Sequence, residues 1–296
     1  MTSTPGEYSR NDGGTNPVPW PPGFGRWRPV FPAVATVMFA VAAVAFALIA
    51  VVAVANGDLL RFVLGSGGMV FGAAGALALS HRLRLRKPLT AGAVTLERAN
   101  PGTSVAISMD RSVTVSLAAA FLGGAVFLVA LALMRMTGDQ VQPLQVMSGV
   151  FFIIVAIACV ALAPLMIATT RVPRRLVLSE HGIHQNNGAL DQYLPWQSIA
   201  AVDAVEADPT EGRSRRRIPM ILLRPTSPSD IAILWRFRWF SQRTFLTAIS
   251  VQPTAYPIDA GLLYYTIRFY WQHPELRTEL SSDTAVLRIR RGDVLG

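Results

Sequence analysis

Two histidines have the spacing in this chain that comes nearest to a metal site. His181 and His184 form an H-x-x-H pair, with Glu180 before the first and Asp191 after the second. A structural zinc site needs four ligands in fixed geometry, and the one cysteine, Cys159, lies within an apolar run far along the chain from this pair. Glu180-His181-Gly182 is typical of a tight turn. We therefore expect a surface turn here, with no metal and no cofactor.

The sequence also lacks recognisable catalytic motifs. No glycine-rich phosphate loop follows a predicted strand, and no G-x-S-x-G motif accompanies the histidines and aspartates. The apolar runs contain no Asp, Glu, Lys, Arg or His, the residues that usually mark ion and proton pathways in membranes. We expect a protein that is not an enzyme, and these runs argue against a proton-coupled transporter or a pump.

One soluble segment, Ile231–Gln242, alternates aromatic rings with arginines. Rings favour the level of lipid headgroups, and each arginine near an anionic surface contributes about 1 kcal/mol. A second basic run, near residue 215, could bind nucleic acid, but next to a bilayer lipid headgroups or plain solvent are favoured. A half-buried strand or a contact with another subunit would explain the aromatic segment equally. The lipid-contact candidates are Arg213, Arg215, Arg216, Arg217, Trp235, Arg236, Phe237, Arg238, Trp239 and Arg243.

Four uncharged runs would anchor the aromatic segment and the basic run next to a membrane. They cover residues 31–55, 62–80, 112–134 and 146–170 within a region that extends from 30 to 171. A helix of about 20 residues crosses the hydrocarbon core, and backbone groups inside lipid need the internal bonds of a helix. The first run is too long for the apolar part of a signal peptide. The sequence therefore predicts a bundle of four transmembrane helices, with Pro164 inside the last.

Arginines predict the orientation of these helices. The segments before the first run, between the second and third, and after the fourth are rich in arginine, whereas the two remaining loops carry one arginine each. Loops rich in Lys and Arg stay in the cytoplasm. We expect a multi-pass protein of the cytoplasmic (inner) membrane, with both termini cytoplasmic.

Small residues recur every fourth position in two of the runs. They are Gly68, Gly72, Ala76 and Ser80 in the second run, and Ser116, Ala120 and Gly124 in the third. Such faces let helix backbones approach closely. They could line a substrate path, but close helix packing, within one copy or between copies, is the favoured interpretation.

Two segments outside the runs are short. Residues 1–29 are rich in Pro and Gly and are expected to be a disordered tail, with Trp20 at the lipid interface or in a polyproline ligand. Residues 82–111 contain two alternating stretches around Asn100-Pro101-Gly102, which predicts a β-hairpin. Two strands alone are marginal in water, so the hairpin should rest on the membrane or on the C-terminal domain.

Residues 172–296 are long enough for a soluble domain. Short strands are predicted over 175–179, 183–186, 192–196, 199–205, 220–224 and 245–251, and Asp259 is placed to cap a helix that runs to about Gln272. Strands followed by a helix predict an α+β domain, an antiparallel sheet closed by one helix.

Part of this domain resembles a known family. Leu176 to Ile183, followed by Leu194-Pro195-Trp196-Gln197-Ser198-Ile199, is similar to bacterial pleckstrin-homology-like (PH-like) domains, although 231–243 matches no strand of that fold. The run from Tyr270 to Leu280 resembles the tail helix of uncharacterised actinobacterial membrane proteins. The resemblance implies a cytoplasmic scaffold that binds lipid or protein, without catalysis.

These observations together favour a membrane scaffold over other classes. The expected partners are anionic lipids of the inner leaflet, with a protein partner or a second copy as further possibilities, and no nucleic acid. The alternative is a transport or channel component that uses the small-residue faces of the helices.

Overall fold

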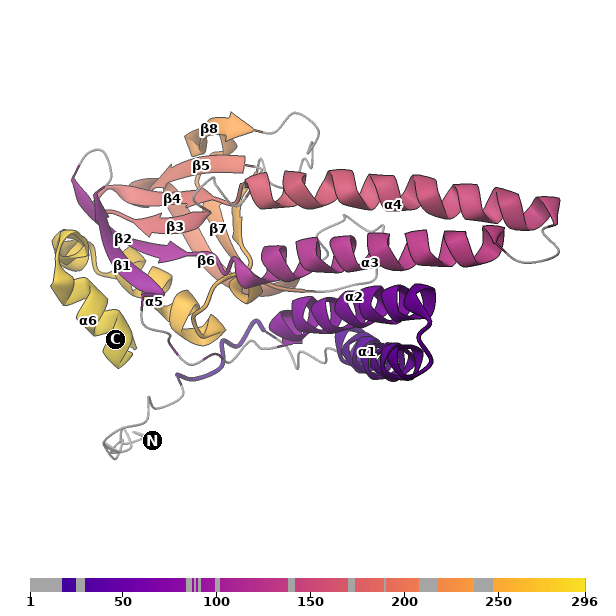
Figure 1. Ribbon diagram of the computed structural model, residues 1–296. Coiled ribbons are helices and arrows are strands. Elements are labelled where there is room, and N and C mark those ends of the chain that lie inside the picture. Colours follow the sequence, from indigo (N-terminus) through magenta and orange to yellow (C-terminus); the bar gives the residue numbers. More distant parts are fainter. Residues whose placement is uncertain are drawn as a thin grey trace.

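The computed structural model of this protein describes residues 18–24, 30–83, 87, 89, 92–98, 102–137, 142–169, 174–188, 190–207, 218–236 and 247–295, without the side chains of Arg82, Thr169, Trp235 and Arg236. It consists of a layer of long helices and a domain of sheets and short helices at one end of that layer (Figure 1).

The four predicted apolar helices are present. They are α1 (Val30–Ala55), α2 (Leu59–Leu83), α3 (Ser112–Met136) and α4 (Pro143–Thr169). All four are long and apolar enough to cross a membrane, since 25 residues at about 1.5 Å each exceed the hydrocarbon thickness of about 30 Å. The helix α2 begins three residues before the predicted run and ends three after it, and α4 continues through Pro164.

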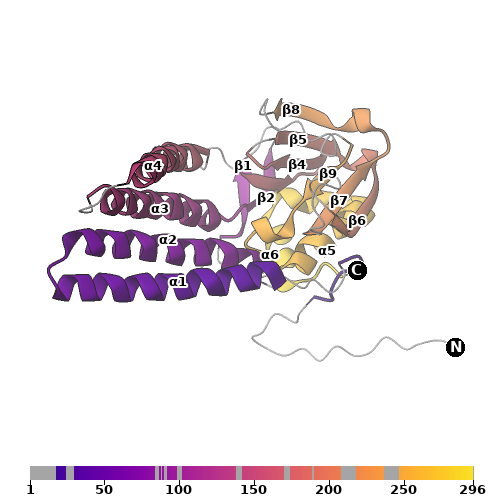
Figure 2. The same ribbon diagram turned by 90° about the vertical axis from the view of Figure 1, so that its right-hand side faces the viewer.

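The helices form a row in chain order. Helix α1 packs on α2, α2 on α3, and α3 on α4 (Figure 2). The most apolar windows of α2 and α3 are 39% buried, against 11% for α1 and α4. The inner pair therefore has protein on two sides, while the outer pair presents apolar side chains outward, as expected for helices in lipid.

Six antiparallel strands make the larger sheet of the domain. In spatial order they are β1 (Val94–Arg98), β2 (Thr103–Ser108), β3 (Arg175–Leu178), β4 (Gly182–Asn186), β5 (Leu190–Pro195) and β8 (Ala232–Arg236). A second antiparallel sheet has the order β6 (Ile199–Ala207), β7 (Ile218–Pro225) and β9 (Ile249–Val251). The single sheet predicted for residues 172–296 is thus two sheets.

The hairpin between α2 and α3 belongs to the larger sheet. Strand β2 pairs with β3, with Val105 opposite Leu178 and Ile107 opposite Leu176, and all four side chains are buried. Arg175 of β3 also forms an ion pair with Glu97 of β1. The folded domain therefore extends beyond residues 172–296 and includes a segment made between two membrane helices.

Three helical elements follow the strands. Helix α5 (Ala260–Gln272) is capped as predicted, because the Asp259 side chain accepts hydrogen bonds from the backbone N–H groups of Gly261 and Leu262. The 3₁₀ segment η5 (Pro274–Ser281) and helix α6 (Asp283–Arg291), which was not predicted, come next. Helix α5 lies on β6, η5 on β2 and α6 on β1, so the helices cover both sheets rather than one.

Residues 18–24 differ most from the sequence prediction. Val18 and Phe24 are buried in the domain core, and the Trp20 Nε1–H donates to the Phe24 carbonyl at 2.7 Å. A methyl group built at Gly23 would lie 1.5 Å from the Ala204 carbonyl oxygen, so only glycine fits where this segment crosses β6. The expectation of a disordered tail is wrong for this stretch, and Trp20 packs on the domain core.

Candidate functional site

The helices meet the domain at a polar junction. Its parts are the last turn of α2, the start of α3, and the 3₁₀ turn η4 (Pro253–Ala255) that follows β9. The Asp110 N–H donates to the Ala255 carbonyl at 2.8 Å. The Lys87 Nζ donates to the carbonyls of Thr254 and Tyr256 at 2.9 and 2.8 Å. The junction thereby fastens the domain to the membrane helices through η4.

Three side chains cluster where α3 begins. The Asp110 carboxylate accepts hydrogen bonds from Ser112 Oγ–H at 2.5 Å and from Ser112 N–H at 2.9 Å. His81, from α2, lies with Nε2 3.2 Å from Ser112 Oγ and with Nδ1 3.5 Å from Asp110 Oδ2. A carboxylate just before a helix also matches the positive end of the helix dipole. The cluster joins the ends of α2 and α3.

Charge at the junction is set by burial and by these contacts. Burial acts to raise the pKa of Asp110, but the hydrogen bonds from Ser112 and the charges of His81 and Lys87 outweigh it, so the pKa of Asp110 lies below its ordinary value. Burial lowers the pKa of Lys87, and the Asp110 charge opposes that change. The carboxylate is therefore ionised at neutral pH and bonded to its neighbours.

This cluster differs from a catalytic triad in the partner of the Ser112 hydroxyl group. In a triad the histidine lies between the serine and the carboxylate and takes the proton of the serine. Here the Ser112 hydroxyl donates directly to Asp110. These bonds orient the start of α3.

The directions of the strands show which strand ends of the domain lie beside the junction. Strand β3 follows α4 and runs away from the helices, so β4 returns, β5 runs away, and β8 returns toward them (Figure 1). In the smaller sheet, β9 ends beside η4, and the register of β7 with β9 and β6 puts Ile218 and Ala207 at the same end. The helix-side end of the domain thus holds the end of β6 and the start of β7, which flank residues 208–217, and the end of β8, which precedes residues 237–246.

The lipid-contact candidates lie in those two segments or at the end of β8. Trp235 and Arg236 lie on β8, where only their backbone is described, and the described residues do not include the others, which are Arg213, Arg215, Arg216, Arg217, Phe237, Arg238, Trp239 and Arg243. Their neighbours in β8 are unusually exposed for apolar residues, with Ile233 at 43% and Leu234 at 63%. Strand β8 lies within the 231–243 stretch that matched no strand of the PH-like pattern, and it pairs with β5.

The small-residue faces lie between helices to different degrees. A methyl group built at Gly72 would lie 2.8 Å from both the Ala43 nitrogen and the Phe39 oxygen of α1, and one at Gly68 would meet the Phe46 ring at 2.5 Å. Gly124 of α3 faces Phe71 of α2 more loosely, at 3.2 Å. Ala120 is buried, whereas Ala76, Ser80 and Ser116 are partly buried. The Ser80 hydroxyl donates to the Leu77 carbonyl of its own helix.

The α1–α2 contact also depends on glycines that the prediction left out. Gly65 would clash with the backbone of α1 near Ala50 and Phe46, and Gly75 with the Phe39 ring. Together with Gly68 and Gly72 they follow a spacing of three, four and three residues, which is one face of a helix. The i, i+4 ladder followed only part of this face.

The histidine pair takes no part in the junction. His184 Nε2 forms a hydrogen bond with Asp191 across β4 and β5, and Asn186 Nδ2 donates to the same carboxylate at 3.1 Å. His181 lies in the turn before β4. No group of three or more His, Cys, Asp or Glu side chains within the described parts of the chain could hold a metal ion.

A second polar cluster explains the run from Tyr270 to Leu280. Glu279 accepts hydrogen bonds from Tyr270 Oη–H at 2.8 Å and from Arg288 Nε at 2.7 Å. Arg277 donates to the carbonyls of Tyr270 and Trp271, and its guanidinium lies over the Trp196 ring. These contacts fasten η5 to α5 and α6, which gives this run a structural role.

Sequence reasoning missed the junction residues. The Asp110-x-Ser112 pattern before an apolar run is a helix-start signal, and Lys87 is the only lysine in the chain. Both features were available, but the partners in η4 lie more than 140 residues away along the chain and no local pattern identifies them.

In comparisons with known proteins, no protein-family model, no curated protein and no solved structure matches the chain.

Proposed function

We propose that this protein is a non-enzymatic membrane scaffold whose PH-like domain binds anionic lipid of the leaflet from which its helices emerge. That leaflet would be the cytoplasmic face of the inner membrane, because the segments rich in arginine lie on the domain side. A protein partner recognised on the same surface is the second possibility within this class.

The direction of the strands is the observation that carries the proposal. The ends of β6 and β8 and the start of β7 lie at the helix-side end of the domain. The segments attached there contain the arginine run of residues 213–217 and the aromatic-arginine run of residues 235–243. Arginines and aromatic rings held within about 8 Å of an anionic surface are attracted to it with little screening.

The fastening of the domain supports the same conclusion. The domain connects to α1, to α2 and α3, and to α4, through residues 18–24, the β1–β2 hairpin and β3 respectively. Lys87 and Asp110 add bonds to η4. A domain held at several points presents one end to the bilayer, as a scaffold requires, instead of swinging on a single linker.

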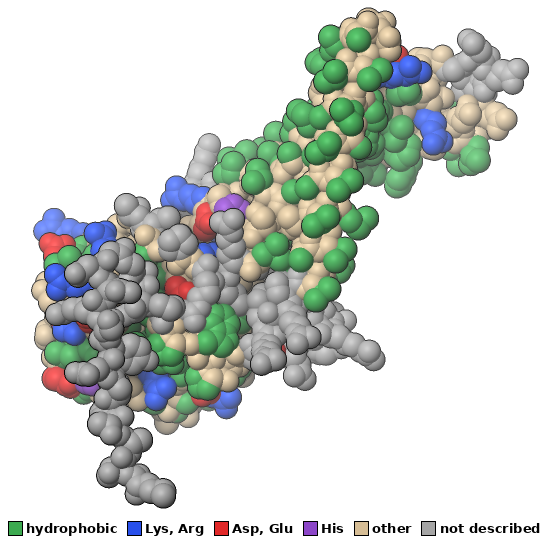
Figure 3. Space-filling model, turned by 90° about the horizontal axis from the view of Figure 1, so that it is seen from below, with side chains coloured by type: hydrophobic (Ala, Val, Ile, Leu, Met, Phe, Trp, Pro, Cys, Tyr) green, Lys and Arg blue, Asp and Glu red, His purple; other side chains and the backbone are tan. Residues whose placement is uncertain are grey.

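The transport alternative receives less support from the helices. The row places α1 and α4 at opposite ends (Figure 2), so it does not close into a ring that could surround a path. Hydrophobic side chains cover its visible face between the domain and a few charges at the far tip (Figure 3).

Hydrogen exchange on the full-length protein in nanodiscs tests the proposal. Backbone amides of residues 208–217 and 237–246 should exchange more slowly in discs that contain phosphatidylglycerol than in discs of phosphatidylcholine, and high salt should remove the difference. The double substitution Arg238→Ser with Arg243→Ser should reduce this protection. Arg98→Ser with Arg291→Ser changes the charge equally at two exposed positions, one on β1 and one on α6, and is the matched control. Equal exchange in both lipids at low salt would reject the lipid surface.

A further inference from the structure

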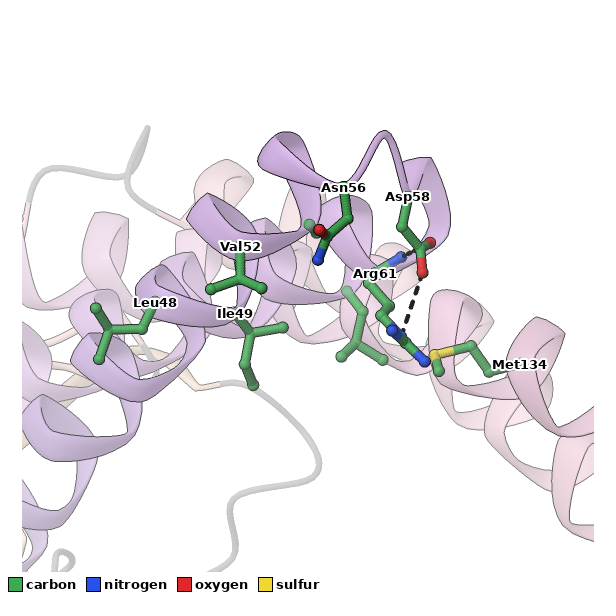
Figure 4. Close-up of a pocket in the computed structure, with 9 residues that line it drawn as sticks. Leu48, Ile49, Val52, Asn56, Asp58, Arg61 and Met134 are labelled. Carbon is green, nitrogen blue, oxygen red and sulfur yellow. Dashed lines mark hydrogen bonds and ion pairs between the residues drawn. The ribbon is translucent and has the colours of Figure 1, made fainter.

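The far ends of α1, α2 and α3 line an open pocket of about 450 Å³ (Figure 4). This volume lies within the range of roughly 300–1,000 Å³ that ligand pockets occupy. The pocket is at the end of the helices opposite the domain, so it is separate from the proposed lipid surface and independent of it.

The walls of the pocket are apolar and open sideways. Leu48, Ile49 and Val52 come from α1, Leu64 from α2 and Met134 from α3. Leu48 and Val52 remain 62% and 58% exposed, so in a membrane this side of the pocket faces lipid tails. From Leu48 to Asn56 the helix rises about 12 Å, which is the length of the upper part of an acyl chain.

The rim of the pocket is polar. Asn56, Asp58 and Arg61 lie where α1 turns into α2, and Arg61 Nε is 3.2 Å from Asp58 Oδ2. The Asp58 carboxylate also accepts the Arg61 backbone N–H at 3.0 Å and so caps α2. Figure 4 shows the two side chains directed toward each other at the end of the pocket. The side chains are 61% exposed for Arg61 and 33% for Asp58, so both are accessible to a ligand.

We propose that this pocket binds one phospholipid with a primary ammonium headgroup, of the phosphatidylethanolamine type, from the leaflet opposite the domain. An acyl chain occupies the apolar walls. The phosphate lies at the Arg61 guanidinium, which has five N–H donors and uses Nε for the ion pair. The ammonium donates to Asp58.

Charge complementarity selects this headgroup over other lipids. The rim carries one positive and one negative side chain, which matches a zwitterion. Phosphatidylglycerol offers a phosphate but no cation, and its negative charge meets Asp58. The quaternary ammonium of phosphatidylcholine has no N–H to donate.

Photo-crosslinking of the full-length protein tests the assignment. The probe is a phosphatidylethanolamine with a diazirine in its acyl chain, present as a minor component of phosphatidylcholine nanodiscs. We expect labels to concentrate on residues 48–64 and on Met134, and unlabelled phosphatidylethanolamine to displace the probe better than added phosphatidylcholine or phosphatidylglycerol. This competition uses the native protein and does not depend on any variant folding.

Two pairs of variants sharpen the result. Val52→Trp fills the pocket and should abolish the concentrated labelling, whereas Val51→Trp places the same side chain outside the pocket on α1. Arg61→Gln should lower labelling about two- to fivefold, the size expected for one exposed charge pair. Arg135→Gln removes a charge at the end of α3 that does not line the pocket and should have no effect.

Three results would overturn the proposal. Labels spread evenly over all four helices and unchanged by Val52→Trp would identify an ordinary lipid layer. Equal displacement by phosphatidylglycerol would reject the role of Asp58. Labels confined to α1 and lost when the protein dimerises would assign the surface to a second copy.

Discussion

Helices α1 and α2 pack closely because glycines on α2 leave room for the backbone of α1, whereas the core of the domain is filled by large side chains. At Gly65 and Gly72 the backbones of α1 and α2 are so close that a methyl group would meet backbone atoms at 2.6 to 2.8 Å. In the domain, Trp196, Tyr256 and Tyr270 are fully buried, and segments from three parts of the chain meet around them. Adding side-chain atoms at α1–α2 should therefore destabilise the helix layer, whereas removing one of its segments should destabilise the domain.

The largest expected effect is the loss of the hairpin from the domain. A fragment of residues 172–296 leaves β3 without β2 and loses the buried side chains of Val94, Val105 and Ile107. At about 1.5–3 kcal/mol for each buried side chain, this approaches the whole stability of a small domain. The fragment should show no cooperative unfolding by near-UV circular dichroism.

A fused fragment provides the control for that experiment. Residues 92–110 joined by a short Asn-Gly turn to residues 174–295 restore the β2–β3 pair and should regain a cooperative transition. Cooperative unfolding of the fragment without the hairpin would show that the domain does not need it.

An added side chain at the α1–α2 contact should have an intermediate effect. Gly72→Leu forces apart two backbones, and overpacking of this kind costs about 1–3 kcal/mol. Thermal unfolding in detergent should shift downward. Gly149→Leu is the matched comparison, because its Cβ would meet only the flexible Met136 side chain at 2.8 and 3.0 Å and the Ala132 oxygen at 3.5 Å. Equal shifts for the two variants would show that the α1–α2 contact is no more sensitive to an added side chain than the α3–α4 contact.

The junction should give the smallest change, and one that depends on pH. Asp110→Ala removes the acceptor of both Ser112 hydrogen bonds, which costs about 1 kcal/mol at neutral pH. The pKa of Asp110 lies below the ordinary value of 3.8, so its contribution is complete above that pH and is lost as the pH falls through the folded value. The difference between variant and native protein should therefore shrink at pH 3.

Asp203→Ala supplies the control for the junction variant. Asp203 pairs with Arg224 on an exposed face of the smaller sheet, where an ion pair contributes little. A melting temperature for Asp110→Ala that matches Asp203→Ala at neutral pH would contradict the structural role of the junction.

Local sequence patterns predicted most helices and strands of this fold, whereas contacts between residues far apart in the chain determine how the strands assemble into two sheets. Uncharged runs located the helices within three residues, and the Asp259 cap located α5. Strand β8 was missed because its sequence, with adjacent apolar residues at 231–235, shows no alternation. Helix α6 was missed because it is short and its last turn contains three arginines, which leave few apolar residues to show a helical period. The two-sheet arrangement depends on the β2–β3 pairing and on burial of Val18 and Phe24, which no periodicity reveals.

The site was predictable to the same extent. Glycine spacing located the face of α2 that meets α1, and His181 was expected to lie in a turn. The junction joins residues 87 and 110 to residues 254–256. Hydrogen bonds to backbone carbonyls place no demand on the types of the accepting residues, so their sequence carries no signal.

The position of the hairpin between α2 and α3 has a consequence for the order in which the larger sheet can form during synthesis. Strand β2 is made before α3 and α4, whereas its partner β3 is made after them. Until then β2 is an unpaired sheet edge, a template for wrong pairing. Strands β2 and β3 lie on the same side of the bilayer when both intervening helices cross it, and on opposite sides when only one of them crosses. Closure of the larger sheet therefore excludes a chain in which only one of α3 and α4 crosses. A chain with one of these helices left uninserted would leave the two halves of its domain on opposite sides of the membrane, exposed to proteolysis.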